Sequence, residues 1–309
     1  MAELELIRAI QDALRGGRFP RVLTGPGDDA AVVRADAVAV TSIDTVVDGV
    51  HFHSATHSPA DVGHKALATA LSDIAAMGAG PGEAYVSLAL PPEFGQGPAL
   101  ELVEAMRALA ERQGVAIAGG DVVSAPVLAV TVSVTGWSGA ADRLVYRWGA
   151  HAGDVVGVTG ELGASGAGLE ALRAGVTEGS LVERHRRPEP LLATGLALAA
   201  AGASAMIDVS DGLATDAGHI ARASRVTLEL SLAALPLAAG VDAEFAATAG
   251  DDYELLFTIR PEHRAAAEQA AAATGTRVTW LGDVRAGGGL VELRGADGAV
   301  VELSGYEHR

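Results

Sequence analysis

The segment VAVTSIDTVV, residues 38–47, alternates its side chains in the way that is typical of a β-strand with one buried face. Successive side chains of a strand point to opposite faces, so one face is expected to carry Val38, Val40, Ser42, Asp44 and Val46. An unpaired charge on such an apolar face costs several kcal/mol. Asp44 therefore constrains the fold, because a group that neutralises it has to lie against this strand.

Aspartates also follow apolar segments elsewhere in the chain. The full set is Asp28 with Asp29, Asp44 with Asp48, Asp73, Asp121, Asp208 with Asp211, and Asp251 with Asp252. Each has a simpler interpretation when it is taken alone. Asp28 and Asp29 fit a turn, Asp211 fits a helix cap, and Asp73 fits a solvated side chain.

A divalent cation would neutralise such a concentration of acids. Between residues 22 and 106 only Arg34 and Lys65 are basic, so ion pairs alone cannot neutralise the acids there. Two close carboxylates repel each other by about 4 kcal/mol at an effective dielectric constant of about 20. Magnesium and calcium prefer oxygen ligands, and magnesium often completes its shell with substrate phosphates. The acids therefore predict phosphate chemistry assisted by a bound metal.

Composition excludes several classes of protein. The absence of cysteine removes disulfides, thiolate nucleophiles and Cys-ligated zinc. The formal net charge of -17 disfavours nucleic acid and anionic membranes as partners. The longest apolar runs are broken by polar residues, and the chain begins without a basic-then-apolar signal, so we expect a cytoplasmic protein. The single lysine, Lys65, is in no Gly-Lys-Ser/Thr sequence, which excludes a Walker A loop.

The periodicity predicts a mixed α/β protein of two domains, with a boundary near residues 140–152. We divide the chain into residues 1–145 and 146–309. Helices are expected over residues 3–14, 60–77, 98–112, 166–175, 190–202, 211–224 and 262–273. Strands are expected over residues 37–47, 85–91, 115–121, 127–137, 154–160, 204–210, 226–231 and 250–259. Ser58 and Pro59 supply a cap and a first-turn proline for the second helix.

Three weaker motifs have competing interpretations. GPGDDA, residues 25–30, fits a dinucleotide-binding pattern, but strand-like residues follow it where a helix is required. GELGASGAGLEAL, residues 160–172, fits a phosphate cradle at a helix N-terminus and a close-packed turn equally well. His51, His53 and His57 could bind zinc, although without cysteine a polar loop or a substrate contact is favoured.

Six segments together identify a family resemblance. GPGDDAAVV, TSIDTVVDGVHF, ALSDIAAMGAGP, GGDVV, DVSDGLATDAGHIARAS and GDDYELLF, in this order, resemble the thiamine-monophosphate kinases of the aminoimidazole-ribotide-synthetase-like superfamily. The resemblance implies two α/β domains, with a homodimer formed through a β-barrel-like interface of the N-terminal domains. It also implies that ATP is held without a P-loop in a cleft that the C-terminal domain completes. The implied reaction transfers the γ-phosphoryl group of ATP directly and in line to thiamine monophosphate, giving thiamine diphosphate.

The resemblance also assigns roles to residues. Magnesium ligands are implied at Asp29, Ser42, Ile43, Asp44, Asp73, Asp121, Asp208 and Asp211, with catalytic roles for Asp44, Asp121 and Asp211. Nucleotide contacts are implied at Gly120, Asp121, Arg147 and Ser210, and substrate contacts at His51, Asp251 and Tyr306. Ile43 stands where relatives often have threonine, so only its backbone carbonyl could be a ligand. Asp251 stands where some relatives have glutamate, and Lys65 is a further candidate phosphate contact.

Other functions remain open at this point. The nearest alternatives are other ATP-dependent enzymes of the superfamily: a selenophosphate synthetase, a cyclo-ligase or a hydrogenase-maturation dehydratase. The first and third typically carry a cysteine that this chain lacks, whereas the cyclo-ligase is disfavoured by motif wording alone. An alternative from a different class is a non-catalytic protein that binds magnesium and nucleotide.

Overall fold

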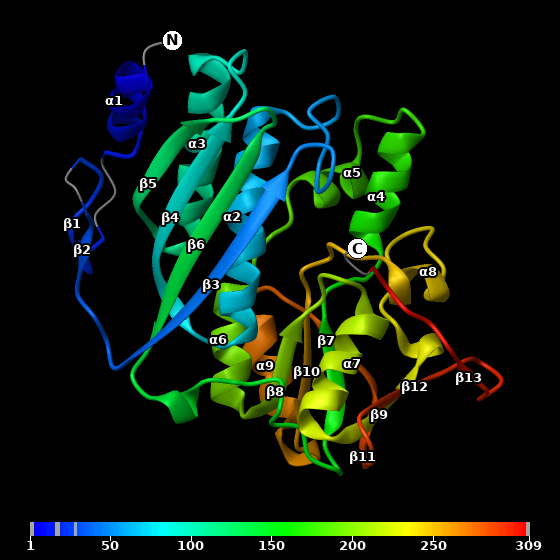
Figure 1. Ribbon diagram of the computed structural model, residues 1–309. Helices are drawn as coiled ribbons and strands as arrows, with labels where there is room; N and C mark the ends of the chain where they lie inside the picture. Colours follow the sequence, from blue (N-terminus) through cyan, green and yellow to red (C-terminus); the bar gives the residue numbers. More distant parts are fainter. Residues whose placement is uncertain (1–2, 16–18, 28–29, 307–309) are drawn as a thin grey trace. The chain divides into compact units, whose positions relative to one another are not determined.

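The computed structural model describes residues 3–15, 19–27 and 30–306, which form two compact units (Figure 1). Unit 1 comprises the residues up to Ile74 together with Gly80–Ala140. Unit 2 comprises Ala75–Ala79 together with the residues from Ala141 onward. Each unit contains both helices and a β-sheet, which confirms the predicted two-domain α/β fold.

Unit 1 is built around a four-stranded sheet in the order β3-β6-β4-β5. The β4 and β5 strands pair in parallel, and the other two pairings are antiparallel. A small antiparallel pair, β1 with β2, lies outside this sheet. The elements are α1 (Glu3–Ala13), β1 (Val22–Thr24), β2 (Val32–Val33), β3 (Val38–Val47), α2 (Pro59–Ala76), β4 (Gly80–Leu90), α3 (Gln96–Gln113), β5 (Ala116–Ser124) and β6 (Ala129–Ser138).

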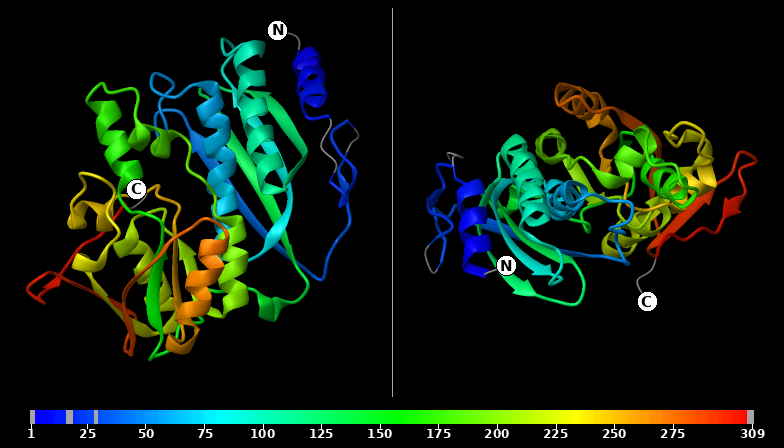
Figure 2. Two further views of the ribbon diagram at one scale, coloured as in Figure 1. Left: turned by 180° about the vertical axis from the view of Figure 1, so that it is seen from behind. Right: turned by 90° about the horizontal axis from the view of Figure 1, so that it is seen from above.

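The helices α2 and α3 cover one face of this sheet and leave the other face bare (Figures 1 and 2). The predicted alternation of β3 is confirmed, because every second residue from Val38 to Val46 is more buried than the exposed residues between them. We call the covered side the inner face and the bare side the outer face. Ser42 and Asp44 therefore point to the inner face, toward the helices.

The start of α2 is fixed by a reciprocal pair of hydrogen bonds. The backbone N–H of Asp61 donates to Ser58 Oγ, and the backbone N–H of Ser58 donates to Asp61 Oδ2. This is a capping box with aspartate in place of the usual glutamate, and it confirms Ser58 as the cap of the helix.

Unit 2 is built around a seven-stranded sheet in the order β13-β12-β9-β11-β7-β10-β8. The β12 and β9 strands pair in parallel, and all the other neighbours are antiparallel. The strands are β7 (Val155–Thr159), β8 (Ala203–Asp208), β9 (Val226–Ser231), β10 (Leu255–Ile259), β11 (Val278–Ala286), β12 (Leu290–Arg294) and β13 (Val300–Val301). The helices are α4 (Ala164–Arg173), α5 (Ser180–Arg186), α6 (Leu192–Ala201), α7 (Leu213–Ser224), α8 (Ala243–Thr248) and α9 (Arg264–Ala273).

The helix α7 packs on one face of this sheet, and α6 and α9 lie together on the other (Figures 1 and 2). The buried side chains of α7 join those of β7, β8, β9 and β10 in one apolar core. This core holds the turn between β8 and α7, which carries Asp208 and Asp211. The short helices α5 and α8 have no counterpart among the predicted elements, because neither is long enough to show a clear apolar period.

The strand predicted over residues 250–259 is wrong in its first half. The strand β10 begins only at Leu255. Asp251 and Tyr253 have φ angles of 66° and 52°, which a β-strand cannot contain. Among the described residues, no helix is long and apolar enough to cross a membrane.

The close approach of α2 and α3 generates a stability prediction. A Cβ atom at Gly63 would lie 2.1 Å from the backbone oxygen of Leu102, so alanine there would force the helices apart. We expect Gly63→Ala to lower the free energy of unfolding by roughly 1–3 kcal/mol in urea titrations. The control is Gly97→Ala in α3, where nothing lies within 4 Å of the added methyl group. That variant should be unchanged or up to about 1 kcal/mol more stable. Equal effects of both substitutions would contradict this packing.

Candidate functional site

The inner face of unit 1 brings two of the predicted acids together. Asp44 on β3 lies next to Asp73 on α2, and Ser42 Oγ donates a hydrogen bond to Asp73 Oδ2. The pKa of Asp44 is raised from 3.8 to about 6, first by burial, then by the charge of Asp73 and by a side-chain hydrogen bond with Asp73. Asp44 Oδ2 is buried and has no hydrogen-bond partner among the described residues. The combination of two carboxylates and a hydroxyl suits a hard divalent cation.

Asp121 is not part of this cluster. It lies on β5, one edge of the sheet, whereas Asp44 lies on β3, the opposite edge. The register places Asp44 in a row with Val132, Val86 and Gly120, and places Asp121 in the next row with Ser87, Thr131 and Thr45. Because neighbouring rows alternate between faces, Asp121 belongs to the outer face. Within one chain the sheet therefore separates Asp121 from Asp44.

Two other predicted positions in unit 1 have a structural explanation of their own. A Cβ atom at Gly120 would lie 2.1 Å from the backbone oxygen of Val86, so the pairing of β4 with β5 requires glycine there. The side chain of Ile43 is 67% exposed on the outer face. Its carbonyl belongs to an edge strand, where groups on one side have no neighbour within the sheet. Asp29 lies outside the described residues.

The predicted histidines occupy the loop after β3. The backbone N–H of Val47 donates to His51 Nδ1 at 3.1 Å, which fixes the ring of His51 against the end of the strand. Among the residues that the structure describes, these histidines form no group close enough to share a metal ion. The polar-loop and substrate-contact interpretations both stay predictions. Lys65 is only 1% exposed, so a ligand in solution has no surface of it to contact.

Unit 2 holds a second acidic cluster, in the turn between β8 and α7. Asp208 ends β8, and Ser210 and Asp211 follow it. The buried carboxylate of Asp216 accepts the backbone N–H groups of both Ser210 and Asp211 at 3.0 Å. The N-cap of α7 is Gly212, without a side-chain cap, so the predicted capping role of Asp211 is wrong. Asp216 shapes the turn instead.

Asp216 was missed by the sequence analysis, although a signal for it exists. Leu213, Ala217 and Ile220 are buried at helical spacing, and Asp216 lies on the same face of α7. An acid on an apolar helix face needs partners in the same way as an acid on an apolar strand face. Burial raises the pKa of Asp216 to about 7, with the charge of Asp208 as the next cause.

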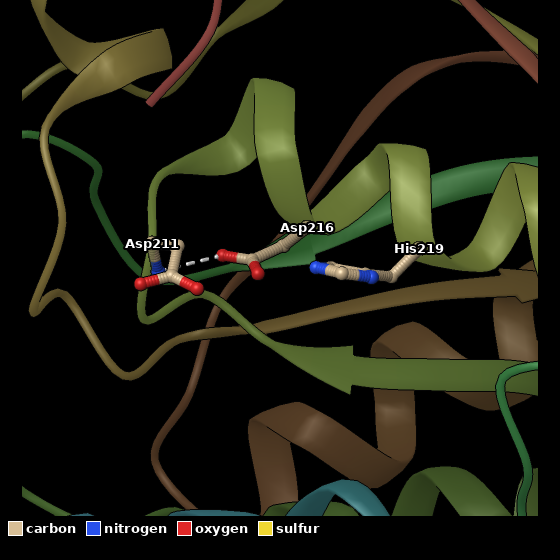
Figure 3. Close-up of side chains that lie close together, drawn as sticks. All are labelled: Asp211, Asp216 and His219. Atoms are coloured by element: carbon tan, nitrogen blue, oxygen red, sulfur yellow. Dashed lines mark hydrogen bonds between the residues drawn. The ribbon is translucent and has the colours of Figure 1, made fainter. Parts of the chain in front are cut away.

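Asp211, Asp216 and His219 lie in a row along the start of α7, with Asp216 in the middle (Figure 3). One ligand atom from each lies within 4.8 Å of the others, the spacing of a possible metal site. His219 Nδ1 faces the guanidinium of Arg222 at 3.3 Å. Arginine can only donate, so Nδ1 accepts and the proton of the neutral ring lies on Nε2. In this tautomer neither ring nitrogen of His219 can bind a metal ion, because Nδ1 accepts from Arg222 and Nε2 carries the proton.

Arg147 acts on the same histidine. Burial lowers the pKa of His219, and the positive charges of Arg222 and Arg147 lower it further, while Asp211 opposes them. The guanidinium of Arg147 is therefore close enough to the start of α7 for its charge to be felt. This places two predicted residues, Arg147 and Asp211, in one electrostatic environment.

The predicted substrate residues Asp251 and Tyr306 lie beside the same turn. The backbone N–H of Asp251 donates to the oxygen of Ser210 at 2.8 Å. The backbone N–H of Tyr306 donates to the oxygen of Asp211 at 2.9 Å. A Cβ atom at Gly305 would lie 1.8 Å from that same oxygen, so only glycine lets the C-terminal segment approach. Residues from three distant parts of unit 2 thus meet at Ser210 and Asp211.

The glycine-rich turn before α4 is a close-packed turn and not a phosphate cradle. The carboxylate of Asp252 accepts the backbone N–H groups of Gly163 and Ser165 at 2.6 and 3.1 Å. It occupies the helix N-terminus where a phosphate would bind. A Cβ atom at Gly160 would lie 2.1 Å from Glu254 Oε1, which explains that glycine by packing. Of the two open interpretations of this segment, the structure favours the turn.

Asp252 generates a pH prediction. Burial raises its pKa from 3.8 to about 7, against the lowering effect of its two backbone hydrogen bonds. The folded chain therefore binds a proton that the unfolded chain releases between about pH 4 and pH 7. The contribution of Asp252 to stability falls as the pH rises through this window, by up to about 1.4 kcal/mol per unit.

The variant Asp252→Asn removes this titration while it keeps the shape of the side chain. We expect the advantage of the wild type over Asp252→Asn in unfolding free energy to be larger at pH 5 than at pH 8. Urea titrations at both values measure it. The difference between the two proteins cancels contributions from other acids that titrate in the same range, and parallel pH profiles would contradict the assignment.

Comparison with known proteins identifies the family of both domains. Residues 27–138 match the AIR synthase related protein, N-terminal domain, and residues 151–293 match the corresponding C-terminal domain. The chain is 45% identical to the thiamine-monophosphate kinase of Mycobacterium tuberculosis strain H37Rv, over 76% of this chain and 71% of that protein.

Two solved structures are similar along almost the whole chain. The thiamine-monophosphate kinase of Stenotrophomonas maltophilia K279a aligns with a TM-score of 0.85 and 33% identity, over 97% of this chain and 98% of that one. AaThiL, complexed with AMPPCP and TMP, aligns with a TM-score of 0.78 and 29% identity, over 99% of this chain and 97% of that one.

Proposed function

Because the chain belongs to the thiamine-monophosphate kinase family, we propose that it transfers the terminal phosphoryl group of ATP to thiamine monophosphate, producing thiamine diphosphate and ADP. The observation in the structure that carries this proposal is the pair Asp44 and Asp73, in which the buried Oδ2 of Asp44 has no hydrogen-bond partner among the described residues. Two close carboxylates destabilise a protein that binds no cation. In a protein that binds a divalent cation beside a phosphate group, the same two carboxylates are ligands. The enzyme is expected to work in the cytoplasm, where ATP is available.

Magnesium is the cation that fits this donor set best, since all of its donors are hard oxygen atoms. Ser42, Asp44 and Asp73 would hold it in unit 1, and Asp208 and Asp211 would do so in unit 2. When bound, the ion supplies positive charge between the carboxylates and the phosphates. Asp29 and the backbone carbonyl of Ile43 remain further candidate ligands by family resemblance.

The remaining residues orient the two reactants. Ser210 and Arg147 are proposed to contact the nucleotide, as is Gly120 through its backbone. His51, Asp251 and Tyr306 are proposed to contact thiamine monophosphate. An oxygen of the substrate phosphate forms a bond to the γ-phosphorus of ATP while the bond to the β–γ bridging oxygen breaks, and ADP leaves. An ionised phosphate oxygen is already a nucleophile, so the chain needs no general base and forms no covalent intermediate.

We also propose a homodimer through the outer face of unit 1. This face carries the exposed Ile43 and two threonine pairs, Thr41 with Thr135 and Thr45 with Thr131. Asp44 and Asp121 lie on strands three steps apart, a separation of about 14 Å at the usual strand spacing. If two sheets close into a barrel, the β3 edge of one protomer meets the β5 edge of its partner. Asp121 of the partner subunit would then lie on the strand next to the one that carries Asp44.

A direct assay of product formation tests the activity. Purified protein with ATP, magnesium and thiamine monophosphate should form thiamine diphosphate, measured by chromatography. Asp44→Asn should lower the rate by about two orders of magnitude or more, because it removes a charge that holds the metal. Asp142→Asn, an exposed acid on a surface turn, is the matched control and should keep its activity.

The outcomes separate the alternatives. Asp44→Asn should remain folded, since the substitution removes repulsion from Asp73. ATP hydrolysis that does not require thiamine monophosphate would favour another enzyme of the superfamily. Nucleotide binding without turnover would favour a non-catalytic protein, and full activity of Asp44→Asn would refute the role of this pair.

Mixing two inactive variants tests the shared site. If Asp44 of one protomer works with Asp121 of the partner subunit, a heterodimer of Asp44→Asn and Asp121→Asn contains one intact site. Random reassociation after mild denaturation should then restore about a quarter of the wild-type activity. If both residues served the same site within one chain, every site in the mixture would carry a substitution. No restored activity, with heterodimers verified by mass spectrometry, would contradict the shared site.

A further inference from the structure

The segment from Gly250 to Glu254 has an unusual backbone for its position before a strand. Asp251 and Tyr253 both have positive φ angles, 66° and 52°. Among the described residues only one other non-glycine residue, Arg225, shares this conformation. Such angles cost of order 1–3 kcal/mol each, and they persist where surrounding contacts enforce them.

Three backbone hydrogen bonds enforce this conformation. The N–H groups of Asp251 and Tyr253 donate to the oxygens of Ser210 and Val209, both at 2.8 Å. The N–H of Val209 donates to the oxygen of Glu254 at 2.7 Å. A Cβ atom at residue 250 would lie 2.5 Å from the Ser210 oxygen, so glycine is required for the approach. The segment is therefore fixed along the turn that follows β8.

Two of its three acids serve the fold. Asp252 accepts two backbone N–H groups at the start of α4. Glu254 accepts a hydrogen bond from Thr159 Oγ1 at 2.6 Å and pairs with Arg184 at 2.8 Å. Both carboxylates are at most 5% exposed, with Asp252 at 4% and Glu254 at 5%. Their contacts fix the ends of the segment against its neighbours.

Asp251 differs from these two acids, because its side chain is half-buried and turns toward the tyrosine two residues later. The hydroxyl of Tyr253 donates to Asp251 Oδ1 at 2.9 Å. Tyr253 is itself 8% exposed, so its ring is held by packing and its hydroxyl presents a fixed donor. The side chains of Asp251 and Tyr253 lie on the same side of the segment, as residues i and i+2 do in a strand. The positive φ angles add the turn of the backbone toward Ser210.

We propose that Tyr253 is a positioning residue for the thiamine-binding carboxylate of Asp251. The inference rests on the proposed function, in which Asp251 contacts thiamine monophosphate. That substrate carries a cationic thiazolium ring and an exocyclic amine, and both pair well with a carboxylate. A carboxylate rotates readily about its last bond, and the fixed hydroxyl removes this freedom before the substrate binds. Tyr253 touches the substrate only through Asp251.

The test is Tyr253→Phe, which deletes one hydroxyl from a buried ring. We expect the KM for thiamine monophosphate to rise about tenfold, the loss of one hydrogen bond to a charged group. The kcat and the KM for ATP should change by less than about twofold, since neither the metal ligands nor the nucleotide contacts move. Isothermal calorimetry with thiamine monophosphate provides an equilibrium reading independent of turnover.

Two controls separate positioning from a general structural effect. Tyr146→Phe removes a hydroxyl that donates to the backbone oxygen of Ala141, and it should leave both KM values unchanged. In an Asp251→Ala background, Tyr253→Phe should add no further loss, because a residue that acts through Asp251 has nothing left to position. Thermal unfolding of each variant shows that the comparison is made between folded proteins.

Each outcome decides a separate question. An unchanged KM in Tyr253→Phe, or an equal further loss in the Asp251→Ala background, would overturn the positioning role and leave the proposed function intact. A parallel rise of both KM values with a lowered melting temperature would also overturn it, in favour of a structural role. A wild-type chain that neither binds nor phosphorylates thiamine monophosphate would overturn the proposed function, and this role with it.

Discussion

The repulsion between Asp44 and Asp73 is the constraint on which the functional interpretation depends. The fold carries Asp44 on the inner face of a well-packed sheet and sets Asp73, one helix away, against it. Among the described residues, Ser42 donates one hydrogen bond to Asp73, and burial further disfavours the charged form of Asp44, which raises its pKa. A chain that only needed stability would lose little by replacing Asp44 with a neutral residue. The presence of Asp44 at this position is explained if a cation neutralises it.

Three acids of this protein, Asp216, Asp252 and Asp44, differ in what their oxygens contact. Asp216 and Asp252 each accept two backbone N–H groups, so their carboxylates complete the fold of a turn or a helix start. Asp44 has a buried oxygen with no such partner among the described residues. Sequence motifs do not separate these two cases, since Asp216 lies within DVSDGLATD and Asp252 adjoins Asp251. Only the contacts reveal which case applies to each of the three acids.

The sequence pattern predicted which face of β3 carries Asp44. It could not predict features that depend on pairing between distant segments of the chain. The alternation along β3 placed Asp44 correctly, because side-chain direction in a strand depends only on position. The separation of Asp44 from Asp121 could not be predicted, because it follows from the strand order β3-β6-β4-β5, which long-range pairing sets. The strand predicted through residues 250–254 failed for a similar reason. Tertiary hydrogen bonds to Val209 and Ser210 hold Asp251 and Tyr253 at angles that no local pattern indicates.

The strain in that segment is consistent with a role in precise placement. Extended backbone would satisfy the apolar pattern of β10 at no conformational cost, yet the chain adopts two unfavourable φ angles just before it. The contacts of Asp252 and Glu254 offset the cost at both ends, and what they hold between them is the pair Asp251 and Tyr253. A loop that merely joined α8 to β10 would need none of these. The backbone strain is explained if the orientation of the Asp251 carboxylate is important for function.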